Sequence, residues 1–403
     1  MARATEAQKI QQANLETAMS RFSEALQSLK DPRRKQGLRY PLETVIVTSL
    51  MAMVAGCDDA EAMEAWSEAN EEWLGTFLAM PHGAPSQDVY LYVFAAVEPT
   101  EFNKVVTEWV ALLRSKLEHA GDHIAIDGKT SRRSGDRAGG KLAIHTVSAW
   151  LSGAGLVLGQ VKTDDKSNEI TAIPELLRTL DLKGTTVTID AMGCQRKIAS
   201  CIKDRGGDYL LSVKANQPAL LSQVAETFKE ASDERMRAVD EEPRPQVLEA
   251  EDTDKGHGRV EVRRVRVTDC LAWVESRKLW KGLTHLVEVT RERTVLKTGT
   301  TSIEKAFFVA SGPVKTASEA SRFLRRHWGI ENSLHWVLDM AFAEDQARHR
   351  AGNAAANMTT LRHLALSLIN QDADRKLGIA NSRRRAGFDR RYLLKLLSGG
   401  GLG

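Results

Sequence analysis

The chain has 403 residues, of which 42% are hydrophobic and 27% charged, a composition typical of a soluble globular protein with two or three domains. The net charge of +3 favours no partner by itself, and four scattered cysteines without a C-x-x-C pair speak against a disulfide framework or structural zinc. The start of the chain lacks the apolar core of a signal peptide, and no segment approaches 18 uninterrupted apolar residues. We therefore expect a reduced, cytoplasmic protein without a membrane span.

The first 120 residues predict a helical domain. Apolar side chains recur at spacings of three and four from Leu15 to Leu29, and again from Phe102 to Leu113. Between them, the segment from Leu42 to Ala55 is apolar enough for a buried helix, and the segment from Ala60 to Met80 is amphipathic. We expect residues 1–120 to form a helical domain that binds DNA or supports assembly of several copies.

The pattern changes at Gly121, where a mixed α/β region begins. A short apolar strand ends at Asp127, and two alternating segments joined by a Gly-rich turn follow it. A helical segment, a strand, a helix, a second strand and a third helix then lead to Ser232. This order predicts a mixed sheet flanked by helices over residues 121–232.

An acidic segment interrupts this α/β order. Residues 230–254 hold ten Asp and Glu against three Lys and Arg. Three alternating segments between Arg259 and Ser311 then predict antiparallel strands. We expect a β-rich insertion at residues 233–312, followed by the second, helical part of the core at residues 313–370.

The end of the chain is basic. From residue 321 onward, 14 Lys and Arg stand against seven Asp and Glu, which suits either a phosphate-facing surface or an ordinary solvated helical surface. Because the sequence finishes in glycines, we expect residues 371–403 to form a loosely packed basic tail.

Two aspartates occupy matching positions. Asp127 ends the apolar run from Ile124, and Asp190 ends the apolar run from Val187. In a sheet of this order the first and fourth strands would lie side by side, so the two carboxylates could meet over a shared Mg²⁺. Each Asp alone could equally cap a strand or start a turn, and it is the pair that favours a metal site.

A third acid, Glu331, lies in a basic and aromatic stretch. Trp328, Glu331, His335 and Asp339 fall at spacings of three and four on one helix face, so Asp339 is an alternative third acid. Two carboxylates at strand ends and a later one on a helix suit a two-metal site for phosphoryl transfer. An ordinary surface helix with i,i+4 polar pairs would show the same spacing.

Basic and polar side chains near these acids are candidates for DNA contacts. The loop after Asp127 could hold phosphate, or could simply be solvated. The polar residues after Val213 could contact a ligand, or could begin a helix with Asn216 as its N-cap. The residues that we expect to contact DNA are Lys129, Arg132, Arg133, Lys214, Gln217, Arg326, His327, Trp328 and Asn332.

Four strings of residues resemble the ISAs-family insertion-sequence transposases of the H-repeat-associated type. They run from Ile126 to Lys129, from Ile189 to Gln195, from Tyr209 to Gln217 and from His327 to Asp339. The resemblance extends from about residue 15 to residue 397. It implies a ribonuclease-H-like core with an N-terminal associated domain, and an Asp-Asp-Glu catalytic triad carried onto Asp127, Asp190 and Glu331.

The resemblance also implies an activity and partners. A transposase of this kind uses two divalent cations, Mg²⁺ or Mn²⁺, to cleave DNA at the ends of an insertion sequence and to join the freed 3′-hydroxyl to target DNA. It would act on double-stranded DNA as a homo-oligomer in the bacterial cytoplasm. The alternatives are a catalytically inactive or domesticated DNA-binding protein and a related nuclease without strand transfer.

One signature of the broader cut-and-paste group is absent. That group carries Tyr-x2-Arg-x3-Glu-x6-Lys around its glutamate, whereas this chain has Leu324, His327, Glu331 and Leu338 at those positions. The DNA contacts of the tyrosine, arginine and lysine therefore do not carry over, and His327 is a candidate replacement for the arginine.

Overall fold

The structure, a computed structural model, describes residues 22–34, 38–117, 122–136, 140–163, 169–232, 246–256, 258–372 and 374–399. The chain divides into two compact units. Unit 1 comprises Met1–Gly121, Gly128–Asn168 and Glu331–Gly403, and unit 2 comprises Asp122–Asp127 and Glu169–Ile330. The expected helix before residue 22 and much of the acidic segment lie outside the described residues.

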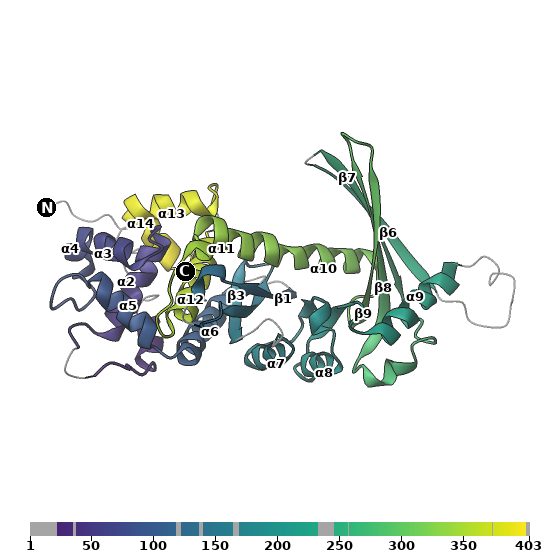
Figure 1. The fold of residues 1–403 in the computed structure, drawn as a ribbon, viewed down its shortest axis with the longest axis horizontal. Helices are drawn as coiled ribbons and strands as arrows, with labels where there is room; N and C mark the ends of the chain where they lie inside the picture. Colours follow the sequence, from purple (N-terminus) through teal and green to yellow (C-terminus); the bar gives the residue numbers. More distant parts are fainter. Residues whose placement is uncertain are drawn as a thin grey trace. The chain divides into compact units, whose positions relative to one another are not determined.

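Unit 1 is mainly helical, and its core forms around one long helix, α12 (Ala354–Asn370), as Figure 1 shows. Nearly every residue of α12 is buried, which is expected of a helix with apolar or small residues on all sides. The elements that pack against α12 are α2 (Leu42–Val54), α5 (Gln87–Ala96), α6 (Pro99–Ser115) and β3 (Leu156–Thr163). The shorter helices α3 (Ala60–Ala69) and α4 (Glu71–Leu74) follow α2, and β2 (His145–Leu151) forms a hairpin with β3.

The end of the chain is helical, so the expectation of a loosely packed tail is wrong for most of it. The segment contains α13 (Ile379–Phe388) and α14 (Arg390–Leu397), which pack against α2 and α12. Arg383 explains the docking, because its buried guanidinium donates to the Met53 carbonyl at 2.8 Å and pairs with Asp58 at 2.6 Å. A buried arginine is stable only with such partners.

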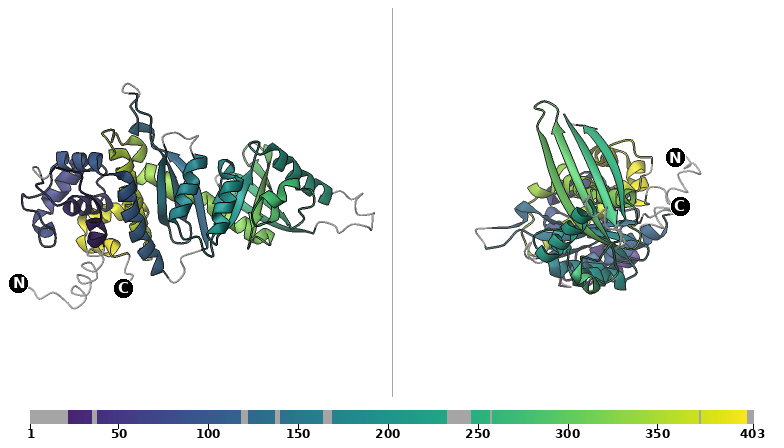
Figure 2. Two further views of the ribbon diagram at one scale, coloured as in Figure 1. Left: turned by 90° about the horizontal axis from the view of Figure 1, so that it is seen from below. Right: turned by 90° about the vertical axis from the view of Figure 1, so that its right-hand side faces the viewer.

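In the described part of unit 2, the strands follow the order β1-β4-β5-β9-β8-β7-β6. The long strands of the insertion stand out in Figure 2. The first part of β1 (His123–Thr130), β4 (Thr186–Ile189) and β5 (Asp208–Val213) are parallel. The four strands that continue the sheet antiparallel are β9 (Thr301–Ser311), β8 (Leu283–Val295), β7 (Arg259–Thr268) and β6 (Val247–Gly256). The helices of this unit are α7 (Glu169–Thr179), α8 (Arg196–Asp204), α9 (Pro218–Ser232) and α10 (Ala317–Ile330).

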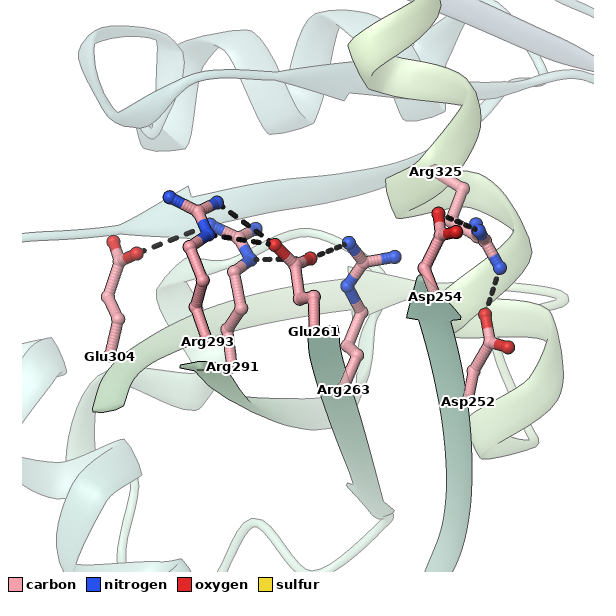
Figure 3. Close-up of polar contacts among 8 residues, drawn as sticks. All are labelled: Asp252, Asp254, Glu261, Arg263, Arg291, Arg293, Glu304 and Arg325. Atoms are coloured by element: carbon pink, nitrogen blue, oxygen red, sulfur yellow. Dashed lines mark hydrogen bonds and ion pairs between the residues drawn. The ribbon is translucent and has the colours of Figure 1, made fainter. Parts of the chain in front are cut away.

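The β-rich insertion extends the core sheet, because β9 pairs directly with β5. Near the core, Val265, Val267, Val287 and Val289 form a hydrophobic cluster with α10. Further along the strands, charged residues replace the valines and pair across β7, β8 and β9 (Figure 3). The strand β6 was not predicted.

The fold class expected from the sequence is confirmed. It is a mixed α/β fold with an N-terminal helical region and a β-rich insertion. In the described part of the chain, no helix has both the length and the apolar character needed to cross a bilayer.

Candidate active site

The first candidate pair, Asp127 and Asp190, lies on neighbouring parallel strands of unit 2. The register aligns Ile126 of β1 with Ile189 of β4, and each aspartate is the next residue. Asp190 follows the end of β4, as expected, whereas β1 continues beyond Asp127 to Thr130. Parallel pairing thus brings the two acidic positions to the same level of the sheet.

The surroundings of Asp190 disfavour its negative charge. Burial raises the pKa of this carboxyl, and the nearby Glu169 carboxylate raises it further. The backbone amides of Gly193 and Met192 and the charge of Lys214 act in the opposite direction. The Met192 amide donates to Asp190 Oδ1 at 3.1 Å, which caps the turn that follows the strand.

Glu169 was not singled out in the sequence. It begins α7 and is only 4% exposed. An acid directly before the apolar positions of a helix is an ordinary feature of a first turn, so no sequence signal separates it from other such acids. Together, Glu169 and Asp190 concentrate negative charge where a divalent cation would be favoured.

The turn after β4 is held closely. Gly193 approaches Ile189 so tightly that a Cβ atom would lie 2.2 Å from Ile189 Cγ2. Asn216 donates to the Ala191 carbonyl at 2.7 Å, and Gln217 donates to the Cys194 carbonyl at 3.0 Å. Asn216 and Gln217 therefore brace the turn that presents Asp190.

The helix α10 is anchored on the sheet of unit 2 by side chains predicted to contact DNA. Arg326 pairs with Asp122 at 2.5 Å. His327 Nδ1 lies 2.8 Å from Thr188 Oγ1 on β4, and burial lowers the pKa of His327 to about 4. In the structure His327 therefore has a partner on β4, and its predicted phosphate contact stays a prediction. Trp328 is 45% exposed.

The third candidate, Glu331, belongs to unit 1 and begins a π-helical segment, Glu331–His335. This segment separates α10 from α11 (Trp336–Ala341), so the single helix face expected from Trp328 to Asp339 is interrupted. Glu331 and Asn332 are exposed. Single π-helical turns inside helices occur frequently at functional sites.

The alternative third acid, Asp339, has a lysine partner within unit 1. Lys129 Nζ lies 2.8 Å from Asp339, 3.6 Å from Glu344 and 3.5 Å from Asp345. The Lys129 side chain is only 12% exposed. Its ammonium pairs with these carboxylates, and its predicted contact with phosphate stays a prediction. We call Lys129 and these three acids the Lys129 cluster.

Three of the remaining candidates for DNA contacts are exposed. The side chain of Arg132 is 82% exposed and pairs with Asp345 at 3.2 Å. Arg133 and Lys214 are exposed as well. These three stay available to a polyanion, whereas Lys129, Arg326 and His327 have structural partners.

Among the described residues, no group of three or more His, Cys, Asp and Glu side chains is arranged to hold a metal ion. The two neighbouring aspartates and the raised pKa of Asp190 nevertheless fit a hard divalent cation, which prefers one or two carboxylates with water and phosphate oxygens.

Comparisons with known proteins agree on one family. Residues 118–368 match a family described as "Transposase DDE domain", and residues 23–110 match one described as "DDE_Tnp_1-associated". "Putative protein YbfL" and "H repeat-associated putative transposase YhhI", both from Escherichia coli (strain K12), are each 34% identical over 95% of this chain and 99% of their own.

A solved structure, a cryo-EM structure of a piggyBac transposase synaptic complex with hairpin DNA, also aligns with the chain. It covers 96% of this chain and 80% of its own, at 10% identity and a TM-score of 0.40. This likeness is too weak to support an argument about the site.

Proposed function

The chain belongs to the DDE transposase family, and from this membership we propose that it cleaves DNA at the ends of an insertion sequence and transfers the cut strand to target DNA. Asp127, Asp190 and Glu331 are the proposed catalytic acids. The observation that supports the proposal best is the parallel register that sets Asp127 beside Asp190. The proposal requires that Glu331 meet this pair in the DNA-bound protein.

In this proposal, Asp127, Asp190 and Glu331 hold two divalent cations, Mg²⁺ or Mn²⁺. When bound, these cations would stabilise the negative charge on the attacking and leaving oxygens of the phosphodiester. The chain itself contributes the orientation of the carboxylates. The Met192 amide donates to one Asp190 oxygen, and Asn216 braces the turn that presents the carboxylate.

The test is cleavage of duplex DNA carrying the sequences that flank the gene, with Mg²⁺, by purified full-length protein. We expect Asp127→Asn, Asp190→Asn and Glu331→Gln each to abolish cleavage while the protein still binds the duplex. Glu226→Gln, an exposed acid-to-amide change on α9, is the matched control. Full cleavage by any one of the three variants would remove that residue from the mechanism.

A second assay separates the proposal from its alternatives. Precleaved ends should be joined to a target plasmid if the protein is a transposase. Cleavage without joining would indicate a nuclease without strand transfer. DNA binding without either reaction would indicate an inactive or domesticated protein.

We further propose that the helices α13 and α14 contact the DNA backbone. An open hollow beside them, within unit 1, is lined by cationic side chains: Arg385, Arg390, Arg391 and Lys395. Phe388, at the same hollow, is 82% exposed. Positive charge beside an exposed aromatic ring suits a nucleic acid, because the cations contact phosphates and a base can stack on the ring.

Salt dependence tests this surface. Each lost phosphate contact should reduce the slope of log K against log salt by about 0.9. We expect the double variant Arg390→Gln with Arg391→Gln to reduce the slope by about 1.8 for a random duplex without metal. Lys229→Gln, 74% exposed on α9, should leave the slope unchanged, and an unchanged slope in the double variant would exclude the α13–α14 surface.

A further inference from the structure

A polar chain, buried at His123 and Thr188 and half-buried at His327, joins three elements of unit 2. His123 Nε2 on β1 lies 2.8 Å from Thr188 Oγ1 on β4, and the same oxygen lies 2.8 Å from His327 Nδ1 on α10. His123 and Thr188 are 0% and 2% exposed. Phe323, one turn before His327, packs its ring against His123 at 5.6 Å between centroids. The last turns of α10 are therefore fixed on the two strands that carry the aspartates.

The hydrogen bonds of this polar chain run in one direction. A threonine hydroxyl has one proton, so it donates to one imidazole nitrogen and accepts an N–H from the other ring. Each partner thus fixes the tautomer of the next, and a buried network of this kind stabilises a single arrangement. Removing the hydroxyl would leave both ring nitrogens without this partner.

The polar chain of His123, Thr188 and His327 lies on the same face of the sheet as the acids. Side chains alternate along a strand, so His123 shares a face with Asp127, and Thr188 shares that face with Asp190. Because His327 contacts Thr188 from α10, the helix lies over this face as well. α10 ends at Ile330, and Glu331 is the next residue.

The opposite side of α10 is held by the β-rich insertion (Figure 3). Arg325 pairs with Asp252, and also with Asp254 at 3.4 Å, both on β6. Arg291 on β8 lies over the Trp328 ring at 5.1 Å, and Glu261 on β7 pairs with Arg291 at 3.5 Å. The two sets of contacts hold α10 from the core strands and from the insertion.

We propose that His327 is a positioning residue, which docks the last turn of α10 on β4 through Thr188 and so sets where the Glu331 backbone begins relative to Asp190. The proposal rests on the proposed function for the roles of Glu331 and Asp190. It gives His327 a task other than the phosphate contact suggested by the sequence. It also gives the insertion a task, because the insertion holds the same helix from its other side.

The hydroxyl of Thr188 offers a matched pair of variants. Thr188→Val keeps the shape and the β-branch but removes the hydroxyl, whereas Thr188→Ser keeps the hydroxyl. Thr186→Val is the control, because Thr186 is on the same strand, is 1% exposed and has a hydroxyl that does not belong to the polar chain. All three are made in the full-length protein.

Two measurements are needed, and neither depends on cleavage. Calorimetric titration of the duplex-bound protein with Mn²⁺ measures metal affinity, and hydrogen exchange measures how firmly residues 324–335 are held. We expect Thr188→Val to weaken Mn²⁺ binding by about tenfold or more, the range for residues that orient metal ligands, and to speed exchange in residues 324–335. Thr188→Ser should restore both to within about twofold, and Thr186→Val should change neither.

Three outcomes would overturn the proposal. They are wild-type Mn²⁺ affinity in Thr188→Val, faster exchange without weaker Mn²⁺ binding, and a loss in Thr188→Ser equal to that in Thr188→Val. Mn²⁺ binding without any DNA cleavage by the wild type would overturn the proposed function alone and leave the positioning role supported. A wild-type protein that binds no Mn²⁺ would overturn both.

Discussion

Two clusters of acidic side chains, one around Lys129 and one around Asp190, differ in the positive charge that balances them. In unit 1, Asp339, Glu344 and Asp345 surround the ammonium of Lys129 at 2.8 to 3.6 Å. In unit 2, Asp190 lies beside Asp127 and near a second acid, Glu169, and its pKa is raised by burial and by that neighbour. The Lys129 cluster carries its own cation, whereas the surroundings of Asp190 would be relieved by a bound one.

This difference separates a structural acid from a candidate metal ligand. Glu331 and Asp339 share one helix face in the sequence, and spacing alone cannot rank them. Asp339 is held by Lys129, while Glu331 is exposed at the start of a π-helical turn. A carboxylate already bound to an internal ammonium is a poor ligand for a second cation, because the two cations would compete for it.

The largest expected effect tests this ranking of the two acids. Glu331→Gln should reduce the rate of DNA cleavage about a thousandfold or more, since a lost metal ligand costs several kcal/mol of transition-state stabilisation. Asp339→Asn should keep the rate within about tenfold of the wild type, because it alters a partner of Lys129 and not a ligand. Single-turnover cleavage rates in Mg²⁺ measure both. The reverse result would make Asp339 the third acid.

The second effect concerns stability. Lys129→Met removes the ammonium beside Glu344, whose side chain is 1% exposed and then keeps a hydrogen bond from Thr359 and the charge of Arg362. We expect the free energy of unfolding to fall by about 3 kcal/mol, as for other broken buried ion pairs. Urea unfolding at pH 7 measures it.

Arg132→Gln is the matched control for Lys129→Met. Arg132 pairs with the same Asp345, but its side chain is 82% exposed, so its loss should change the free energy of unfolding by about 0.5 kcal/mol or less. Equal losses in the two variants would mean that the burial of the cluster contributes nothing.

The sequence predicted the acid pair because each aspartate closes a short apolar run, and runs of that kind form neighbouring strands in this order. It missed β6 because Glu249 and Glu251 resemble a solvated acidic segment until Arg266 and Arg264 of β7 lie opposite them. It also extended one helix through residue 331, since side-chain spacing does not encode a π-helical turn. The internal partners of Lys129 and His327 depend on tertiary packing, which local patterns do not report.

The third effect is a pH dependence of stability. His327 has a folded-state pKa of about 4, lowered by burial from 6.5. Between these values the unfolded chain binds more protons than the folded protein, so stability falls as the pH is lowered through this window. Compared with His327→Gln, the wild type should lose up to about 2 kcal/mol more between pH 7 and pH 5.

Urea unfolding of both proteins across this range measures the difference. His349 and His363 also have lowered pKa values and stay in both proteins, so their contributions cancel. Burial lowers the pKa of His123 and the charge of His327 lowers it further, so the comparison reports on these two histidines together. Parallel pH profiles would show that His327 takes up its proton as readily in the folded protein as in the unfolded chain, which would contradict the lowered pKa.

The smallest effect is expected where acids and arginines pair near the surface of the insertion. Glu261 is shared by Arg263, Arg291 and Arg293, and the Arg293 side chain is 38% exposed (Figure 3). Arg293→Gln should lower the free energy of unfolding by about 0.5 kcal/mol or less, because two arginines remain and solvent screens the lost pair. The difference should vanish in 1 M salt, where charges are screened within about 3 Å. A loss of unfolding free energy as large as that of Lys129→Met would show that shared arginines stabilise an acid as strongly as the buried ammonium does. The contrast between the acids around Lys129 and those around Asp190 would then rest on metal binding alone.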